Sequence, residues 1–335
     1  MSALVIPAAL AVVLAASSIA GPALVRAAAP ALTRVPRTAV LVLTGSLLLW
    51  MLAVASLSLM AAWMVTGPDV LPAPFAETCR QCLDAASPFA PTTVDTGIPV
   101  VLLLLLPAFG LFALLGLGVP RWLRRHRATR SAAQALAERA RIACVGGYRV
   151  LVIDDPRPVA FSLPRRYGGI VVSDGLDAAL ESDELAAVLE HEHAHLRQHH
   201  HVLLSILGGL TCPLRRVPLV AAIADAIPHY LEIAADNAAR GHAGTPALAS
   251  ALLKLGAPGN HPTATPGEPL SGLLLHAAGP DRIGHLVSPA RARSAVLPAS
   301  TLGLQLIAFA VVVAAVHGPY MYVVLSGCIT GAPPW

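Results

Sequence analysis

IPVVLLLLLPAFGLFALLGLGVPRWLRRHRATR (residues 98–130) has two halves of opposite character. Up to residue 119 it is almost purely apolar, and a run of roughly 20 apolar residues is long enough to cross a bilayer as a helix. The remainder carries five arginines and no acidic residue. Because basic residues beside a membrane span gather on the cytoplasmic side, the stretch predicts a membrane helix that enters the cytoplasm near residue 120.

The rest of the chain shares this apolar character. Of its 335 residues 56% are hydrophobic and 13% are charged, whereas soluble domains have about 25% charged residues. This composition excludes an ordinary soluble protein, and further runs at about 3–25, 39–65 and 300–326 are long enough to cross a bilayer. In the first run the basic residues follow the apolar ones, so we expect a retained span and not a cleaved signal peptide.

The loops between the spans differ in charge. Residues 26–37 contain three arginines and no acid, whereas residues 67–97 contain four acidic residues and one arginine. The positive-inside rule therefore predicts that 26–37 and 120–298 are cytoplasmic, and that 67–97 and both chain ends are external. We expect a multi-pass protein of the bacterial inner membrane, in contact with lipid along its spans.

The five cysteines divide between the two sides of this topology. Cys79, Cys82 and Cys328 fall outside, and Cys144 and Cys212 fall inside. The CxxC at 79–82 has no second CxxC to complete a zinc site, so we expect an external disulfide or plain thiols. Three external cysteines leave one over, and their pairing stays open.

Residues 120–298 are long enough to form one domain. The pattern over 130–145 favours a helix that ends at Gly146 and Gly147. Runs rich in β-branched residues follow, and they predict strands within 148–154, 158–164 and 168–176. Helical patterns then cover 182–212, 217–244 and 246–256.

These patterns predict a mainly α, polytopic membrane protein in three parts. Residues 1–119 hold three spans and the external loop. Residues 120–298 form a cytoplasmic α+β domain with a small β-sheet. Residues 299–335 hold a fourth span and a short external tail. The path of 202–228 relative to the membrane stays open, because its apolar part is too short to span.

The stretch LEHEHAHLRQHHH (189–201) follows Ser182, a suitable N-cap, and contains no Gly or Pro, so it lies on a helix. Residues four apart on a helix share a face, so His191 and His195 can hold one Zn²⁺ between them. Glu192 lies about 100° round the helix and can reach a water on the metal. The spacing HExxH thus predicts one zinc per chain, with Glu192 as the catalytic base.

A catalytic zinc needs a third protein ligand and an open fourth position. Glu232, in EIAAD on a later helical pattern, is the candidate. Asp236 lies four residues on, and an isolated carboxylate on an apolar helix is costly to bury. Glu232 on zinc and Asp236 bonded to the outer N–H of a ligand histidine would satisfy both carboxylates.

The other polar residues of this segment have weaker claims. His193 faces away from the His191/His195 side, and Glu190 belongs to the surface or to the support of the ligands. The HHH at 199–201 is expected to be interfacial or solvated. His229 and His242 are candidates to bind the developing oxyanion. Ile170, Val171 and Val172 are candidates for an exposed sheet edge that holds peptide substrate as an added strand, with an ordinary core strand as the alternative.

The spans, together with AFSLP, GGIVVSDGL, LESDELAAVLEHEHAHL, EIAAD and DRIGHL, resemble the integral-membrane gluzincin peptidases over about residues 100–326. The BlaR/MecR-type family is the nearest resemblance, and HtpX-like and CAAX-prenyl-protease families share the motifs. The resemblance implies zinc ligands at His191, His195 and Glu232, the general base at Glu192, and a site that faces the cytoplasm.

For the BlaR/MecR type the resemblance also implies a substrate, a small DNA-binding repressor whose cleavage is regulated. About nine residues follow the fourth span, so we expect none of the external penicillin-binding domain that the beta-lactam sensors carry. We expect a zinc metalloendopeptidase that makes no direct contact with nucleic acid, and its oligomeric state stays open. An HtpX-like quality-control protease, or a non-catalytic metal-sensing protein that uses the histidine run, are the alternatives.

Overall fold

The computed structural model describes residues 2–87, 94–256, 295–323 and 325. Four of its helices are long and apolar enough to cross a membrane: α1 (Ser2–Leu32), α2 (Pro36–Met64), α4 (Val100–Arg139) and α12 (Val296–Val323). The described residues are thus mainly helical, with small β-sheets, and the predicted fold class is confirmed. The helices lie at the four predicted spans.

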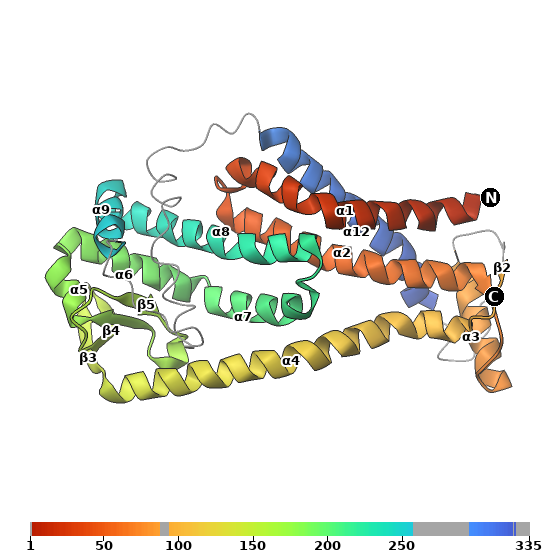
Figure 1. Cartoon of the computed structure of the whole chain (residues 1–335), viewed down its shortest axis with the longest axis horizontal. Helices are drawn as coiled ribbons and strands as arrows, with labels where there is room; N and C mark the ends of the chain where they lie inside the picture. The colour runs from red at the N-terminus through yellow and green to blue at the C-terminus, as the bar shows by residue number, and fades with distance from the viewer. Residues whose placement is uncertain (1, 88–93, 257–294, 324, 326–335) are drawn as a thin grey trace.

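Three of these helices form a bundle, and the fourth leaves it. α1, α2 and α12 pack side by side together with α8 (Pro218–Ala243), whereas α4 runs along one side of the molecule and diverges from the bundle (Figure 1). Near the far end of α2 lie the helix α3 (Ala73–Ala86) and the paired strands β1 (Val65–Thr66) and β2 (Val94–Asp95). These elements form the small region between α2 and α4.

In this region Cys82 is disulfide-bonded, whereas Cys79 is free. The two cysteines of the CxxC are therefore not joined to each other. Cys144 and Cys212 are also free. Cys328 lies outside the described residues.

The third span continues without a break into the predicted helix after it. α4 runs to Arg139 and ends there, so the helix predicted over 130–145 is wrong in its last residues. Residues Arg141–Val145 form the strand β3 instead. Gly146 and Gly147 have φ of +57° and +83° and join β3 to β4 (Tyr148–Ile153). Two residues with positive φ make the type I′ turn that hairpins favour, so these glycines close a hairpin and do not end a helix.

The four-stranded sheet has the order β3-β4-β6-β5, with β5 at Ala160–Ser162 and β6 at Ile170–Ser173. β6 pairs with β4 in parallel and with β5 antiparallel, so it is an interior strand. Ile170, Val171 and Val172 are buried on both faces. The prediction of an exposed edge at these residues is therefore wrong, and the described strand at that side of the sheet is β5.

Five α-helices follow the sheet up to residue 256: α5 (Asp174–Ala179), α6 (Ser182–Arg197), α7 (His200–Thr211), α8 and α9 (Thr245–Leu255). Glu181 caps α6, and the Glu184 side chain accepts the Glu181 N–H in return, a capping box. The predicted N-cap, Ser182, is thus already the first helical residue.

The two faces of the sheet pack against different helices. Val150, Val152, Ile170 and Val172 face α6, whereas Leu151, Phe161 and Val171 face the final turns of α4. α6 in turn packs along α8, which lies against α1 and α2 (Figure 1). The HExxH helix is therefore held between the sheet and a helix that belongs to the membrane bundle.

α7 lies alongside α4 where the apolar part of α4 ends. A Cβ on Gly118 would come within 2.6 Å of the Gly209 carbonyl oxygen, so the two backbones nearly touch. One helical turn along, Trp122 donates its indole N–H to the Ser205 hydroxyl at 2.5 Å. These contacts place α7 beside α4 at the point where the apolar half of α4 gives way to its arginine-rich half.

Candidate metal centre

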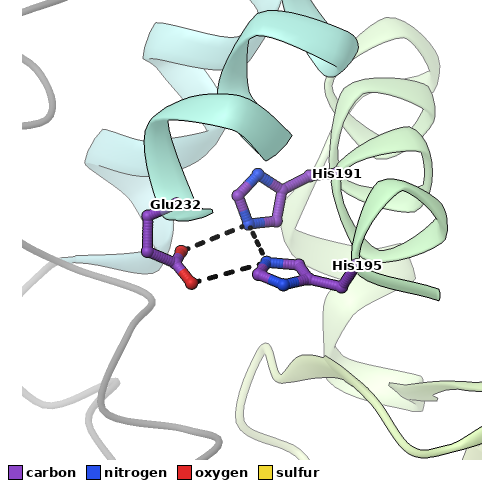
Figure 2. A group of neighbouring side chains, drawn as sticks. All are labelled: His191, His195 and Glu232. Atoms are coloured by element: carbon purple, nitrogen blue, oxygen red, sulfur yellow. Dashed lines mark hydrogen bonds and ion pairs between the residues drawn. The ribbon is translucent and has the colours of Figure 1, made fainter. Parts of the chain in front are cut away.

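Three side chains from two helices meet at one point between α6 and α8 (Figure 2). The Nε2 atoms of His191 and His195 are 3.1 Å apart. Each lies 3.5 Å from a different carboxylate oxygen of Glu232. All the ligand atoms lie within 4.8 Å of one another.

Local structure explains why these atoms meet. His191 and His195 are four residues apart on α6, so their side chains project from the same face. Glu232 lies in the middle of α8, on the face that packs against α6, and its neighbours Ile233 and Ala235 are fully buried. The packing of α6 against α8 thus brings together His191 and Glu232, which are 41 residues apart in the sequence.

The donor set fits a zinc ion. Zn²⁺ binds imidazole nitrogen and carboxylate oxygen, and catalytic zinc sites use three protein ligands and leave the fourth position open. Glu232 is only 6% exposed, and a carboxylate removed from water is costly unless a positive charge compensates it. A divalent cation held between this carboxylate and the two imidazoles would supply such a charge.

The other ring nitrogen of His191 faces Asp236. Asp236 Oδ1 lies 3.0 Å from His191 Nδ1, and Asp236 is 1% exposed. With Nε2 turned toward the cluster, Nδ1 is the nitrogen left to carry the ring proton, and it lies at ion-pair distance from this carboxylate. Such a partner fixes the ring orientation and raises the basicity of the ligand nitrogen.

The other ring nitrogen of His195 faces a residue that sequence reasoning missed. His195 Nδ1 lies 2.9 Å from Nδ1 of His200, whose side chain is 2% exposed. The prediction that His200 is interfacial or solvated is therefore wrong. The reason is a break in the helix: His199 adopts φ +56° between the end of α6 and the start of α7, so His200 does not continue the register of α6 and its ring meets that of His195.

Both of these histidines are held in the neutral form. Burial, and after it the neighbouring His191, lower the pKa of His195 to about 2. Burial also lowers the pKa of His200 to about 4. A metal ligand must be deprotonated at its ligand atom, so a neutral His195 is ready to bind.

The other two histidines of the HHH differ from His200. His199 is exposed, as predicted. His201 is half-buried, and its Nε2 lies 3.2 Å from the Ser162 hydroxyl on β5. Burial lowers the pKa of His201 too. His201 therefore links the start of α7 to β5, and it is less exposed than His199.

Glu192, His193 and Glu190 lie elsewhere on α6. Glu192 is partly exposed and follows the ligand His191 directly, about 100° round the helix. His193 turns away from the cluster and lines a cavity of about 1120 Å³ on the other side of α6. Glu190 is buried and accepts the Tyr148 hydroxyl at 2.5 Å, so it supports α6 against the sheet.

His229 and His242 are both exposed on α8. The His229 ring packs against the Tyr230 ring, with centroids 5.7 Å apart. His242 is ten residues beyond Glu232, about 15 Å along the helix, and so it does not lie with the cluster. DRIGHL lies outside the described residues.

Residues 123–252 match the family model of Peptidase family M48. The matched segment begins in the polar half of α4 and ends in α9, and it contains the sheet and the whole cluster. Together with four apolar helices, the match indicates a metallopeptidase of the membrane. It does not single out the BlaR/MecR type. No solved structure matches the chain.

Proposed function

We propose that this protein is a membrane zinc endopeptidase whose active site is the cluster of His191, His195 and Glu232. The observation that carries the proposal is the meeting of two imidazole nitrogens and a carboxylate from two helices. The family match over the same residues supports it. Hydrolysis of a peptide bond is the reaction.

When bound, the zinc ion supplies Lewis-acid chemistry, lowering the pKa of a water molecule and polarising the peptide carbonyl. His191, His195 and Glu232 hold it through Nε2, Nε2 and the carboxylate. Glu192, beside His191 on the partly exposed side of α6, takes the proton from the attacking water. Glu192 then gives that proton to the leaving amine.

The substrate strand is proposed to add to β5 and not to β6. Val159 O accepts from Ser173 N, and Leu163 N donates to Gly169 O, so alternate residues of β5 face β6. The backbone groups of Ala160 and Ser162 therefore point to the other side, where no strand pairs with them among the described residues. β5 packs on α6, the helix that carries His191 and His195, and this packing supports a substrate strand at the β5 edge.

A proline at Ala160 tests this edge. The substitution removes an outward N–H and leaves the β5–β6 ladder intact, and edge strands tolerate proline at such positions. Ala160→Pro should raise KM for a peptide substrate and leave zinc content unchanged. Phe161→Pro is the matched control, because it removes an inward N–H and should destabilise the protein. An unchanged KM in Ala160→Pro would exclude β5 as the substrate edge.

We further propose that the site faces the cytoplasm and that its substrate is a repressor-like or membrane-associated protein. Five arginines follow the apolar half of α4, on the side where the sheet lies. The small region of α3, β1 and β2 lies at the opposite end of the molecule and would receive any external signal (Figure 1). A quality-control protease uses the same site, and the genes beside this one would distinguish the two roles.

Glu192→Gln in the full-length purified protein tests the peptidase itself. The isosteric amide cannot accept the proton, so hydrolysis of a fluorogenic casein should fall to background while zinc stays at about one per chain. His193→Gln, on the opposite side of α6, is the matched control and should retain both. Unchanged hydrolysis in Glu192→Gln would exclude the peptidase mechanism. Several metals per chain would favour the non-catalytic metal-sensing protein.

A further inference from the structure

A chain of hydrogen bonds runs from the metal centre to the membrane helix α2. His195 Nδ1 is 2.9 Å from His200 Nδ1, and His200 Nε2 is 3.3 Å from Gln198 Oε1. The same Gln198 oxygen accepts the Nε–H of Arg37 at 3.2 Å. Arg37 is the second residue of α2, so the chain connects a ligand on α6 with a different part of the molecule.

The proton on each nitrogen follows from the two ends of the chain. His195 presents Nε2 to the cluster, so its ring proton lies on Nδ1 and is donated to His200. His200 Nδ1 must then be the acceptor, which leaves its proton on Nε2. This Nε2–H donates to Gln198 Oε1, an atom that also accepts from Arg37. Each hydrogen bond in this series then has one donor and one acceptor. Gln198 Oε1 accepts both the bond from His200 and the bond from Arg37.

A break in the backbone between α6 and α7 makes the contact between His195 and His200 possible. α6 ends at Arg197, and the left-handed His199 interrupts the helix before α7 begins at His200. A left-handed conformation is uncommon for a residue other than glycine, although histidine is among those that adopt it. Without this break His200 would continue along α6 and could not meet His195 at five residues' separation. The break therefore serves the contact between the two rings.

We propose that His200, Gln198 and Arg37 position the zinc ligand His195 and couple the metal centre to the cytoplasmic end of α2. A shift of α2 relative to α6 would then turn the His195 ring and change zinc affinity. None of the three residues touches the metal, so all act as positioning residues. The inference rests on the proposed zinc site, and its readout is metal binding, not hydrolysis.

The test measures zinc dissociation constants of the full-length protein by competition with a chelator, for wild type and single variants. His200→Leu removes the acceptor of the His195 N–H and should weaken zinc binding about 10–100-fold, the usual effect of losing such a partner. His200→Asn places an amide oxygen near the position of Nδ1, so it should restore most of the affinity. A role in packing alone would not distinguish the two substitutions in this way.

Arg37→Met and Gln198→Leu cut the chain farther from the metal and should give smaller losses of zinc affinity. Arg26→Met is the matched control, because it removes another exposed arginine, on the neighbouring helix α1, for which no hydrogen bond to Gln198 is found. In the His200→Asn background, where the link to Gln198 is already cut, Arg37→Met should have no effect. The visible spectrum of the Co²⁺-substituted protein should shift in His200→Leu, because it reports ligand orientation.

Three results decide the inference. Losses in the order His200→Leu, Gln198→Leu, Arg37→Met, with rescue by His200→Asn, support it. Wild-type zinc affinity and cobalt spectrum in Arg37→Met and Gln198→Leu overturn the coupling to α2, even if His200→Leu fails to fold. A wild-type protein that binds no zinc overturns the zinc site and, with it, this inference.

Discussion

The two histidine ligands are supported in different ways. His191 Nδ1 lies 3.0 Å from Asp236, a buried carboxylate on α8, the helix that also supplies Glu232. His195 donates to His200, a neutral ring whose further contacts run through Gln198 to Arg37 on α2. The direct partner of one ligand is thus a buried carboxylate, and that of the other is a neutral imidazole whose further contacts end at Arg37, outside residues 123–252. A movement of α2 should therefore change the orientation of His195 and leave that of His191 unchanged.

Substitution of Glu232 should have the largest effect on zinc binding, because its carboxylate faces both histidine ligands. Glu232→Gln keeps the shape of the side chain and removes its negative charge. Zinc occupancy should fall from about one per chain to near zero, measured by elemental analysis after dialysis. Asn237→Ala, on the same helix, is the matched control and should keep its zinc. Full retention of zinc in Glu232→Gln would remove Glu232 from the site.

Loss of the charge behind His191 should have the next largest effect. Asp236→Asn preserves an acceptor oxygen but removes the charge that makes the ligand nitrogen more basic, so zinc affinity should fall about 10–100-fold. This loss should at least equal that of His200→Leu, measured in the same competition experiment. A smaller effect in Asp236→Asn than in His200→Leu would contradict the distinction between the charged and the neutral support.

Glu184, a carboxylate on α6, is an example of a group with a structural role alone. Glu184 is buried and accepts hydrogen bonds from Ser250 at 2.5 Å and from Lys254 Nζ at 2.6 Å, which tie α9 to α6. Glu184→Gln should lower the Tm by a few degrees, on the order expected for a lost charged hydrogen bond, and should leave zinc affinity unchanged. A change in zinc affinity would show that the start of α6 also positions the ligands.

The pH dependence of this smaller effect has a definite sign. Hydrogen bonds from Lys254 and Ser250 lower the pKa of Glu184 to about 2, from an ordinary value near 4.5. The stabilisation is therefore complete above about pH 5 and is lost as the pH falls toward 2. The Tm difference between wild type and Glu184→Gln should be constant from pH 6 to about 8 and should shrink below about pH 4.5. A difference that grows on acidification would contradict this account.

Local sequence patterns predict the ligands whose positions depend on the register of a single helix. The spacing of His191 and His195 gives one face of α6 from sequence alone, and EIAAD gives a second helix with paired carboxylates. The spans were predictable for a similar reason, because length and apolarity are properties of a single segment. The structure brings these local predictions together at one place.

The residues that support His195 could not be predicted, because their positions depend on contacts between distant segments. Nothing in LRQHHH marks His199 as a break, since the stretch has no Gly or Pro, and the contact with Arg37 joins positions 161 residues apart. The edge of the sheet was misplaced for the same reason, because strand order is not a property of one strand. One signal was overlooked: the continuous apolar run IVV is typical of an interior strand buried on both faces.

The ligand set itself is the central claim, and zinc X-ray absorption on the purified full-length protein tests it most directly. The account predicts one zinc per chain, bound by two imidazoles and by oxygen at about 2.0–2.2 Å, without sulfur. In Glu192→Gln this spectrum should keep both imidazoles. Sulfur in the first coordination shell, or more than one zinc per chain spread over the histidine run, would contradict the account.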